Sequence, residues 1–140
     1  MKYFKVYELV SKEIYDKMGD DALTLFNHKI LTALDDLREY MQAPCTCNNW
    51  HEGGQFQHRG YRTPEEASAL GAPNSEHAKG EAFDVDFKGW TADMVRRKIL
   101  TDMDNPLLAN ITRIEAGVSW LHFDCKELVA PQKRIYFFVA

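Results

Sequence analysis

The residues best suited to chemistry lie in the stretch Ser75–Asp86, where a histidine is followed at short intervals by a glycine and an aspartate: His77, Gly80 and Asp84. An imidazole nitrogen and a carboxylate oxygen are both ordinary ligands of zinc. A second polar cluster downstream, at Trp120–Asp124, could supply a third ligand. Three protein ligands with an open fourth position are typical of catalytic zinc, so this pattern raises the hypothesis of a hydrolytic metal site.

The same residues also fit a site that contains no metal. The stretch 82–87 alternates as a strand with Asp84 and Asp86 on one face, and a second strand would carry His122 and Asp124 on one face. If these strands are antiparallel neighbours, the two polar faces meet. A buried histidine–carboxylate pair joined by a hydrogen bond would then explain two of the residues, so spacing alone leaves both interpretations open.

The chain has 140 residues, of which 45% are hydrophobic and 27% charged, as is typical of one soluble globular domain spanning residues 1–140. The net charge of −4 argues against a general nucleic-acid binder, because phosphate binding needs a basic surface. The sequence has no apolar run long enough to span a membrane and no signal peptide at its start. We therefore expect a monomer that is made in the cytosol and has neither nucleic acid nor membrane as a partner.

The three cysteines, Cys45, Cys47 and Cys125, are expected to be reduced thiols, because their number is odd and no signal peptide precedes them. Cys45 and Cys47 resemble half of a thiolate metal site, but no matching pair follows. Small thiols are common in protein cores, and we expect these two to be core residues.

The order of helical and strand patterns predicts an α+β protein. N-terminal helices are expected at residues 12–19 and about 20–42, where apolar side chains recur at helical spacing. Two later helices are expected from Pro64 onward and at 92–101, the latter with Met94, Val95 and Ile99 facing inward. Strands are expected at 45–48, 82–87, 111–115, 120–125 and, after a turn at 130–133, 134–139. We expect the N-terminal helices to pack on a small, mainly antiparallel sheet that carries the metal site.

Arg62 is expected at the junction between a loop and the helix that begins at Pro64. From there its guanidinium could reach a neighbouring pocket and bind a substrate carboxylate through two parallel hydrogen bonds. A surface salt bridge to Glu65 or Glu66 is the alternative that sequence alone favours.

Two segments carry a family resemblance. The pattern Ser75-x-His77-x-x-Gly80-x-Ala82-x-Asp84, followed by Trp120-x-His122, resembles the zinc D-alanyl-D-alanine carboxypeptidases of peptidase family M15. The upstream segment 60–65 is similar to the part of that family that carries a substrate-binding arginine. The resemblance covers about residues 60–124 and implies the fold that this family shares with the hedgehog signalling domain.

The resemblance also implies a role for each matching residue. One zinc ion would be bound by His77, Asp84 and His122. Arg62 would grip a carboxylate or nearby carbonyl of the substrate, and Ser75 would border the site. Asp86 has no ligand role in this match, and we expect it either next to a ligand residue or exposed.

Two acidic residues are candidates for the general base. Many members of the family have an acidic residue three positions before the last zinc histidine, and that position is Ser119 here. Glu115 is our first choice as the base, and it would need the following turn to bring its carboxylate over the metal. Asp124, two residues after His122, is the second choice, and it could instead hydrogen-bond a ligand histidine.

The resemblance implies a zinc metallopeptidase that hydrolyses an amide bond in peptidoglycan stem peptides, as a D-Ala-D-Ala carboxypeptidase or an endopeptidase. The alternative is a non-catalytic zinc-binding module of the same fold, acting in binding or as a phage structural component. A cell-wall substrate for a protein without a signal peptide points to a phage endolysin or tail-associated lysin. Such a protein would be released from the cell or delivered on the virion.

Overall fold

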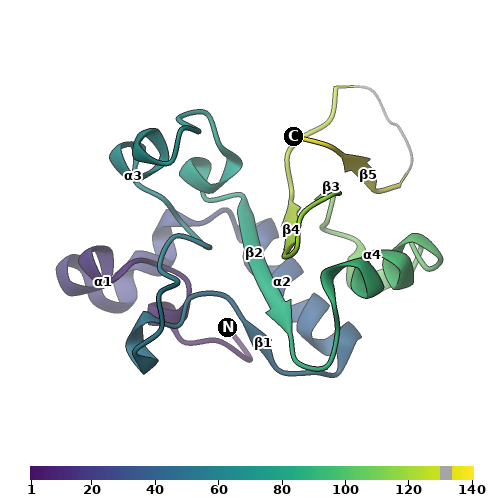
Figure 1. The fold of residues 1–140 in the computed structure, drawn as a ribbon, viewed down its shortest axis with the longest axis horizontal. Helices are drawn as coiled ribbons and strands as arrows, with labels where there is room; N and C mark the ends of the chain where they lie inside the picture. Colours follow the sequence, from purple (N-terminus) through teal and green to yellow (C-terminus); the bar gives the residue numbers. More distant parts are fainter. Residues whose placement is uncertain (130–133) are drawn as a thin grey trace.

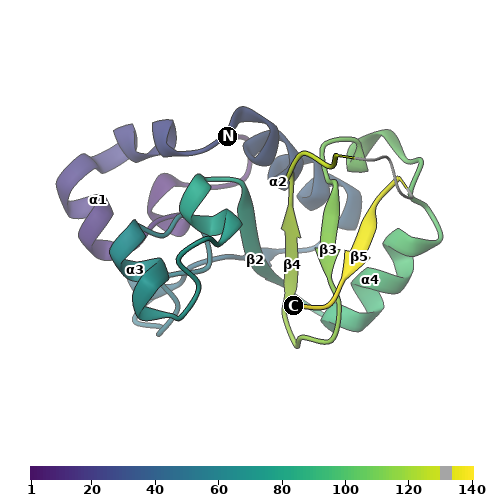
Figure 2. The same cartoon turned by 90° about the horizontal axis from the view of Figure 1, so that it is seen from above.

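The computed structural model describes residues 1–129 and 134–140 and shows an α+β chain arranged around one sheet (Figure 1). Within the described residues the sheet is 5-stranded, with the order β1-β2-β4-β3-β5. Figure 2 shows β2, β4, β3 and β5 side by side in this order. The strands are β1 (Cys45–Thr46), β2 (Ala82–Phe87), β3 (Arg113–Glu115), β4 (Leu121–Asp124) and β5 (Tyr136–Phe138).

The sheet is mixed, although most of its strand pairs are antiparallel. β2 pairs antiparallel with β1 and with β4, and β3 pairs antiparallel with β4. β5 instead lies parallel to β3. The expected α+β class and the predominance of antiparallel pairs are therefore confirmed, with β5 as the exception.

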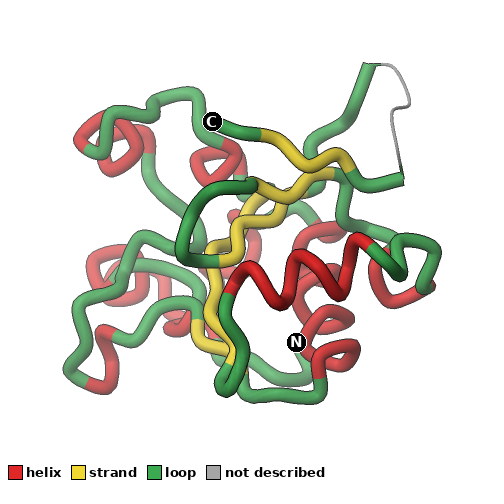
Figure 3. Tube along the Cα trace, turned by 45° about the vertical axis from the view of Figure 1, so that its right-hand side comes forward, coloured by secondary structure: helices red, strands yellow, loops and turns green. Residues whose placement is uncertain are grey.

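In the part of the chain that the structure describes, four α-helices lie around the strands, which Figure 3 shows gathered between them. All four begin at a residue whose side chain accepts a hydrogen bond from the first turn: Ser11, Asn27, Thr63 and Thr91. Such caps satisfy backbone donors that have no partner within the helix. The helices are α1 (Lys12–Met18), α2 (His28–Met41), α3 (Pro64–Ala69) and α4 (Ala92–Leu100).

Strand alternation separates the core from the polar face of the sheet. Phe83 and Val85 of β2 and Phe123 of β4 are fully buried and belong to the same core cluster as the apolar face of α2. Because successive side chains of a strand point to opposite faces, Asp84 and His122 must face away from this core. The site residues therefore lie on the face of the sheet opposite α2.

The helix expected at about 20–42 is divided in two. Residues Gly19–Leu25 form a 3-10 helix, Phe26 is extended, and α2 begins only after Asn27, whose side chain accepts from the N–H of Lys29. The break has a tertiary cause: the N–H of Asn27 donates to the carbonyl of Gly80, at 2.9 Å. The loop that carries the metal motif thus docks where the predicted helix is interrupted.

Smaller differences concern element ends and one side chain. Met94 was expected to face the core but is 47% exposed, because it lies off the stripe formed by Val95 and Ile99 on α4. The last strand is shorter than the expected 134–139 and comprises only Tyr136–Phe138. The turn expected at 130–133 lies outside the described residues.

Two expectations about the chain as a whole can be compared with the structure. None of the described helices has the length and apolar character needed to cross a membrane. Cys45, Cys47 and Cys125 are free thiols, as expected. Cys47 is buried in the hydrophobic core, and the half-buried Cys45 packs against it.

Candidate metal centre

His77, Asp84 and His122 come together on the polar face of the sheet. One candidate ligand atom from each lies within 4.8 Å of the others, and all three residues are buried. His77 comes from the 3-10 turn Glu76–Lys79, and the other two from neighbouring strands. The pairing of β2 with β4 sets Asp84 directly opposite His122. The chemistry of this donor set, two imidazoles and one carboxylate, means that the cluster could hold a metal ion.

Two neighbours shape the turn that presents His77. The hydroxyl of Ser75 accepts a hydrogen bond from the His77 N–H at 3.1 Å and thereby starts the turn. Gly80 ends it with a φ of 68°, a left-handed conformation that glycine adopts without steric cost. A side chain at Gly80 would also meet the carbonyl oxygen of Leu25, which lies 2.1 Å from the position of a Cβ. The motif therefore requires glycine here for both reasons.

The ring of His77 is oriented by the backbone. Its Nδ1 lies 2.9 Å from the carbonyl oxygen of Gly60. A carbonyl only accepts hydrogen bonds, so Nδ1 carries the hydrogen. The other nitrogen, Nε2, lies 3.2 Å from Oδ1 of Asp84. This tautomer leaves the Nε2 lone pair directed at the centre of the cluster, where a metal ligand must point.

The ring of His122 lies between two carboxylates. Nδ1 is 2.9 Å from Oδ1 of Asp84, and Nε2 is 2.9 Å from Oδ2 of Asp124. Arg113 holds Asp124 in turn, donating from Nε to Oδ1 at 3.0 Å and from Nη2 to Oδ2 at 2.8 Å. A histidine that donates one N–H to a carboxylate and offers the other nitrogen to a metal is a common arrangement in metal sites. In such an arrangement Nδ1 would be the nitrogen of His122 that faces the metal.

These contacts determine the charges in the cluster. Burial disfavours a charged His122, but its hydrogen bonds to Asp124 and Asp84 outweigh burial and raise its pKa to about 9. Burial alone would raise the pKa of Asp84, yet the adjacent His77 and His122 hold that pKa well below its usual range. The pKa of Asp124 is lowered against burial by His122 and Arg113. Both carboxylates are thus anionic, which suits them to bind or support a cation.

Arg62 lies beside the cluster, at the junction between loop and α3. Its Nη2 is 3.5 Å from Oδ2 of Asp84, and its Nε donates to the carbonyl of His58 at 2.7 Å. The side chain is largely buried. Among the described residues it forms no ion pair with Glu65 or Glu66, so the surface salt bridge favoured by sequence alone is not found.

A cavity of about 370 Å³ opens onto the cluster of candidate metal ligands, and we call it the metal cavity. It distinguishes the two candidate bases, because only one of them lines it. Glu115, half-buried at the end of β3, lines it together with Arg62 and Ser75. Asp124 is fully buried, is engaged by His122 and Arg113, and is not among the described residues that line the cavity. Only Glu115 of this pair is placed to reach a molecule in the cavity.

The other two residues singled out in the sequence, Asp86 and Ser119, do not belong to the cluster of candidate ligands. Asp86 is exposed, and its carboxylate pairs with Nη1 of Arg59 at 2.8 Å. Among the described residues it has no hydrogen bond or ion pair with His77, Asp84 or His122. Ser119 is exposed near the tip of the β3–β4 hairpin and does not line the metal cavity.

Three features of the site were missed in the sequence. Arg113 fixes Asp124, and its alternation with Glu115 along β3 would have placed both on the polar face. Glu76 is a buried carboxylate that lines the cavity and pairs with Lys79 at 3.1 Å. The carbonyl of Gly60 orients His77, and no sequence pattern indicates such a backbone contact.

Comparisons with protein-family models, with curated proteins and with solved structures found no match for this chain. The site is therefore defined by its own geometry: two imidazoles and a carboxylate, buried at the floor of a cavity that also holds a glutamate and an arginine.

Proposed function

We propose that this protein is a zinc metallopeptidase that hydrolyses an amide bond in peptidoglycan stem peptides. The observation that carries the proposal is the convergence of His77, Asp84 and His122 at the floor of a cavity that Glu115 and Arg62 also line. The pattern of the ligand and arginine segments resembles peptidase family M15, and membership of that family, with its hedgehog-like fold, is part of the proposal.

The donor set supports zinc as the metal. Nε2 of His77, Nδ1 of His122 and a carboxylate oxygen of Asp84 are three ligands of the types that catalytic zinc sites use. When bound, zinc would supply Lewis acidity, polarising a substrate carbonyl and making water a better nucleophile at neutral pH. The contacts with Gly60 and Asp124 engage the opposite ring nitrogens, Nδ1 of His77 and Nε2 of His122, so the two nitrogens named above are the ones that would face a metal.

Glu115 is proposed as the general base. Its carboxylate would accept a proton from the attacking water as the bond between the water oxygen and the amide carbon forms. The same carboxyl group would then give that proton to the amine nitrogen as the carbon–nitrogen bond breaks. The place of Glu115 in the metal cavity supports this role, and the commitment of Asp124 to His122 and Arg113 argues against the alternative.

Arg62 is proposed to orient the substrate. Its Nε is held by the carbonyl of His58, so the guanidinium is fixed at the cavity wall. The remaining N–H groups suit the planar geometry of a substrate carboxylate. Fixing the substrate in this way brings its amide carbon close to the reacting water without further loss of freedom in the transition state.

The test combines metal analysis with product analysis. Purified protein should contain one zinc per chain by elemental analysis, and His77→Ala, Asp84→Ala and His122→Ala should each lose it. Incubation with purified peptidoglycan, followed by mass spectrometry, should show a single type of amide bond cleaved. Full zinc occupancy in any of the three variants would refute the ligand assignment, and intact peptidoglycan with zinc bound would refute the catalytic one.

The second candidate is a non-catalytic zinc module of the same fold, acting in binding or as a phage structural component. It is favoured by Ser119, which occupies the position where many members of the resembling family carry an acidic residue. Zinc retention without cleavage of any peptidoglycan bond is the result expected of this candidate. In either case we propose a monomeric protein that reaches the cell wall by release from a host cell or on a virion.

A further inference from the structure

A second cavity adjoins the metal cavity and has no role in the proposed reaction. It has a volume of about 450 Å³ and shares Asp84 and Trp120 with the metal cavity. Beyond Trp120 it is lined by the side chains of Phe56, Arg59 and Asp86 and by Ser119. The two cavities thus meet at Asp84 and Trp120, beside the candidate metal ligands.

Asp86 gives this second cavity its chemical character. Its side chain is 49% exposed, whereas that of its partner Arg59 is only 12% exposed. Arg59 donates to one oxygen of the carboxylate, Oδ2, and its guanidinium also stacks over the ring of Phe56 at 4.2 Å. In this ion pair Asp86 is the partner with the exposed side chain, and it lines the cavity. Its second oxygen, Oδ1, is available to a further donor.

Trp120 lines both cavities and therefore lies at the boundary between them. Its Nε1 is buried and has no hydrogen-bond partner among the described residues. A buried indole N–H normally finds an acceptor. Because this nitrogen is closed to solvent, Trp120 contributes to the cavity through its aromatic ring and not through its N–H group.

We propose that this second cavity is a substrate subsite for a positively charged amino-acid side chain, with Asp86 receiving its ammonium group. The inference rests on the proposed peptidase function and adds the class of residue that flanks the cleaved bond. Lysine or another diamino acid in a stem peptide has the required chemistry, an ammonium group on a flexible apolar chain. The aromatic walls formed by Phe56 and Trp120 suit both the cation and its aliphatic stem.

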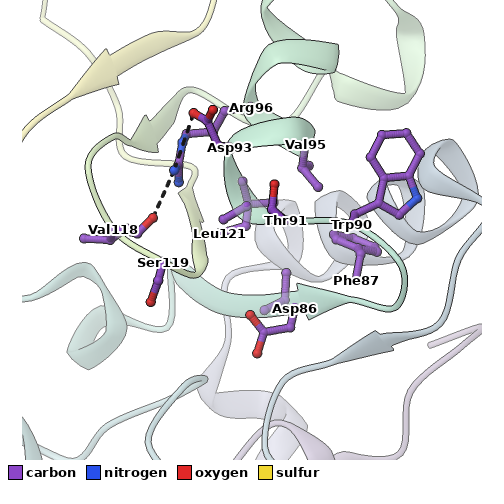
Figure 4. Close-up of a pocket in the computed structure, with 12 residues that line it drawn as sticks. Asp86, Phe87, Trp90, Thr91, Asp93, Val95, Arg96, Val118, Ser119 and Leu121 are labelled. Atoms are coloured by element: carbon purple, nitrogen blue, oxygen red, sulfur yellow. Dashed lines mark hydrogen bonds and ion pairs between the residues drawn. The ribbon is translucent and has the colours of Figure 1, made fainter.

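The neighbouring pocket at α4 provides a matched control. Figure 4 shows Asp86 and Asp93 among the residues of that pocket, with Asp93 on the α4 side next to Arg96. Asp93 is also exposed and ion-paired, with Arg97 at 3.1 Å, but it does not line the cavity beyond Trp120. Asp93→Asn therefore makes the same change of charge near the site without affecting the proposed subsite.

The experiment is a binding titration with the zinc-loaded Glu115→Gln protein, in which cleavage is suppressed. The probes are a purified muropeptide whose stem peptide carries lysine and the same muropeptide acetylated on the lysine amine. The free amine should bind roughly fivefold more tightly, as expected for a half-exposed ion pair, and the preference should shrink at high salt. Adding Asp86→Asn should abolish the preference, while adding Asp93→Asn should leave it intact.

Equal binding of the two probes, binding of neither, or a preference that survives Asp86→Asn would each overturn the subsite. Cleavage of peptidoglycan by the unmutated chain is measured separately by mass spectrometry. Cleavage without the binding preference would reject the subsite and leave the peptidase function standing. An Asp86-dependent preference without any cleavage would keep the subsite and reject the peptidase function.

Discussion

Nε2 of His122 lies 2.9 Å from Oδ2 of Asp124, two residues along the same strand. Because residues two apart in a strand point to the same face, the geometry of β4 alone brings these two side chains together. The contact engages Nε2 with the carboxylate of Asp124 and points the other ring nitrogen, Nδ1, toward Asp84. Arg113 then fixes the carboxylate from the adjacent strand. The orientation of a candidate metal ligand is thus set by residues that would not touch the metal.

Replacing Asp124 tests this orientation. Asp124→Asn should fold but bind zinc about 10–100-fold more weakly, because the ring loses a charged partner that fixes its tautomer. Competition with a chelator of known affinity measures the change. Asp16→Asn, which alters an exposed carboxylate paired with Lys12, is the control and should bind zinc as the unmutated chain does. Unchanged affinity in Asp124→Asn would show that the contact does not orient the ligand.

Replacing Glu115 tests the general base. Glu115→Gln keeps the shape of the side chain but cannot accept a proton, so turnover of peptidoglycan should fall by about 10²–10⁴-fold. Zinc content should stay the same, since Glu115 is not a ligand. Glu76 is the other glutamate whose side chain lines the cavity, and it is not a candidate metal ligand. If Glu76→Gln loses turnover and Glu115→Gln does not, the base is Glu76.

Gly80 packs the turn that carries His77 against the N-terminal part of the chain. Gly80→Ala should disturb both the turn and this packing. The added methyl would meet the carbonyl of Leu25 and also occupy a left-handed conformation. Gly89 has a similar φ of 83° but no neighbour within 4 Å of its Cβ position. In urea denaturation Gly89→Ala should cost about 1 kcal/mol. Gly80→Ala should cost roughly 2 kcal/mol more. Equal losses would contradict the close contact.

Arg96 connects α4 to the hairpin between Glu115 and His122. Its guanidinium donates to the carbonyl of Val118 at 2.9 Å, the contact drawn in Figure 4, and to that of Trp120 at 3.2 Å. Arg96→Met should lower the free energy of unfolding by about 2 kcal/mol, because two carbonyls lose a charged donor. Its neighbour Arg97 is largely exposed, and Arg97→Met should change stability by less than about 0.5 kcal/mol. Denaturant titration of both variants measures the difference.

The parts of the fold that local patterns control could be predicted from the sequence. β2 begins and ends as expected because alternation over Ala82–Phe87 is regular, and α1 has the serine cap and glycine end that its sequence indicates. The meeting of Asp84 and His122 followed from the assumption that two polar strand faces are neighbours. Tertiary contacts account for the rest. The helix break at Asn27 depends on Gly80, and the role of Arg113 depends on a partner in another strand.

The contact between Asn27 and Gly80 also provides a probe of the site that needs no substrate and no mutation. The amide hydrogen of Asn27 is held by the carbonyl that follows the His77 turn. Its exchange with solvent deuterium must therefore await an opening of that turn away from the N-terminal helices. Zinc binding at His77 would slow that opening. The exchange rate of this one backbone hydrogen would then report how firmly the metal holds its loop.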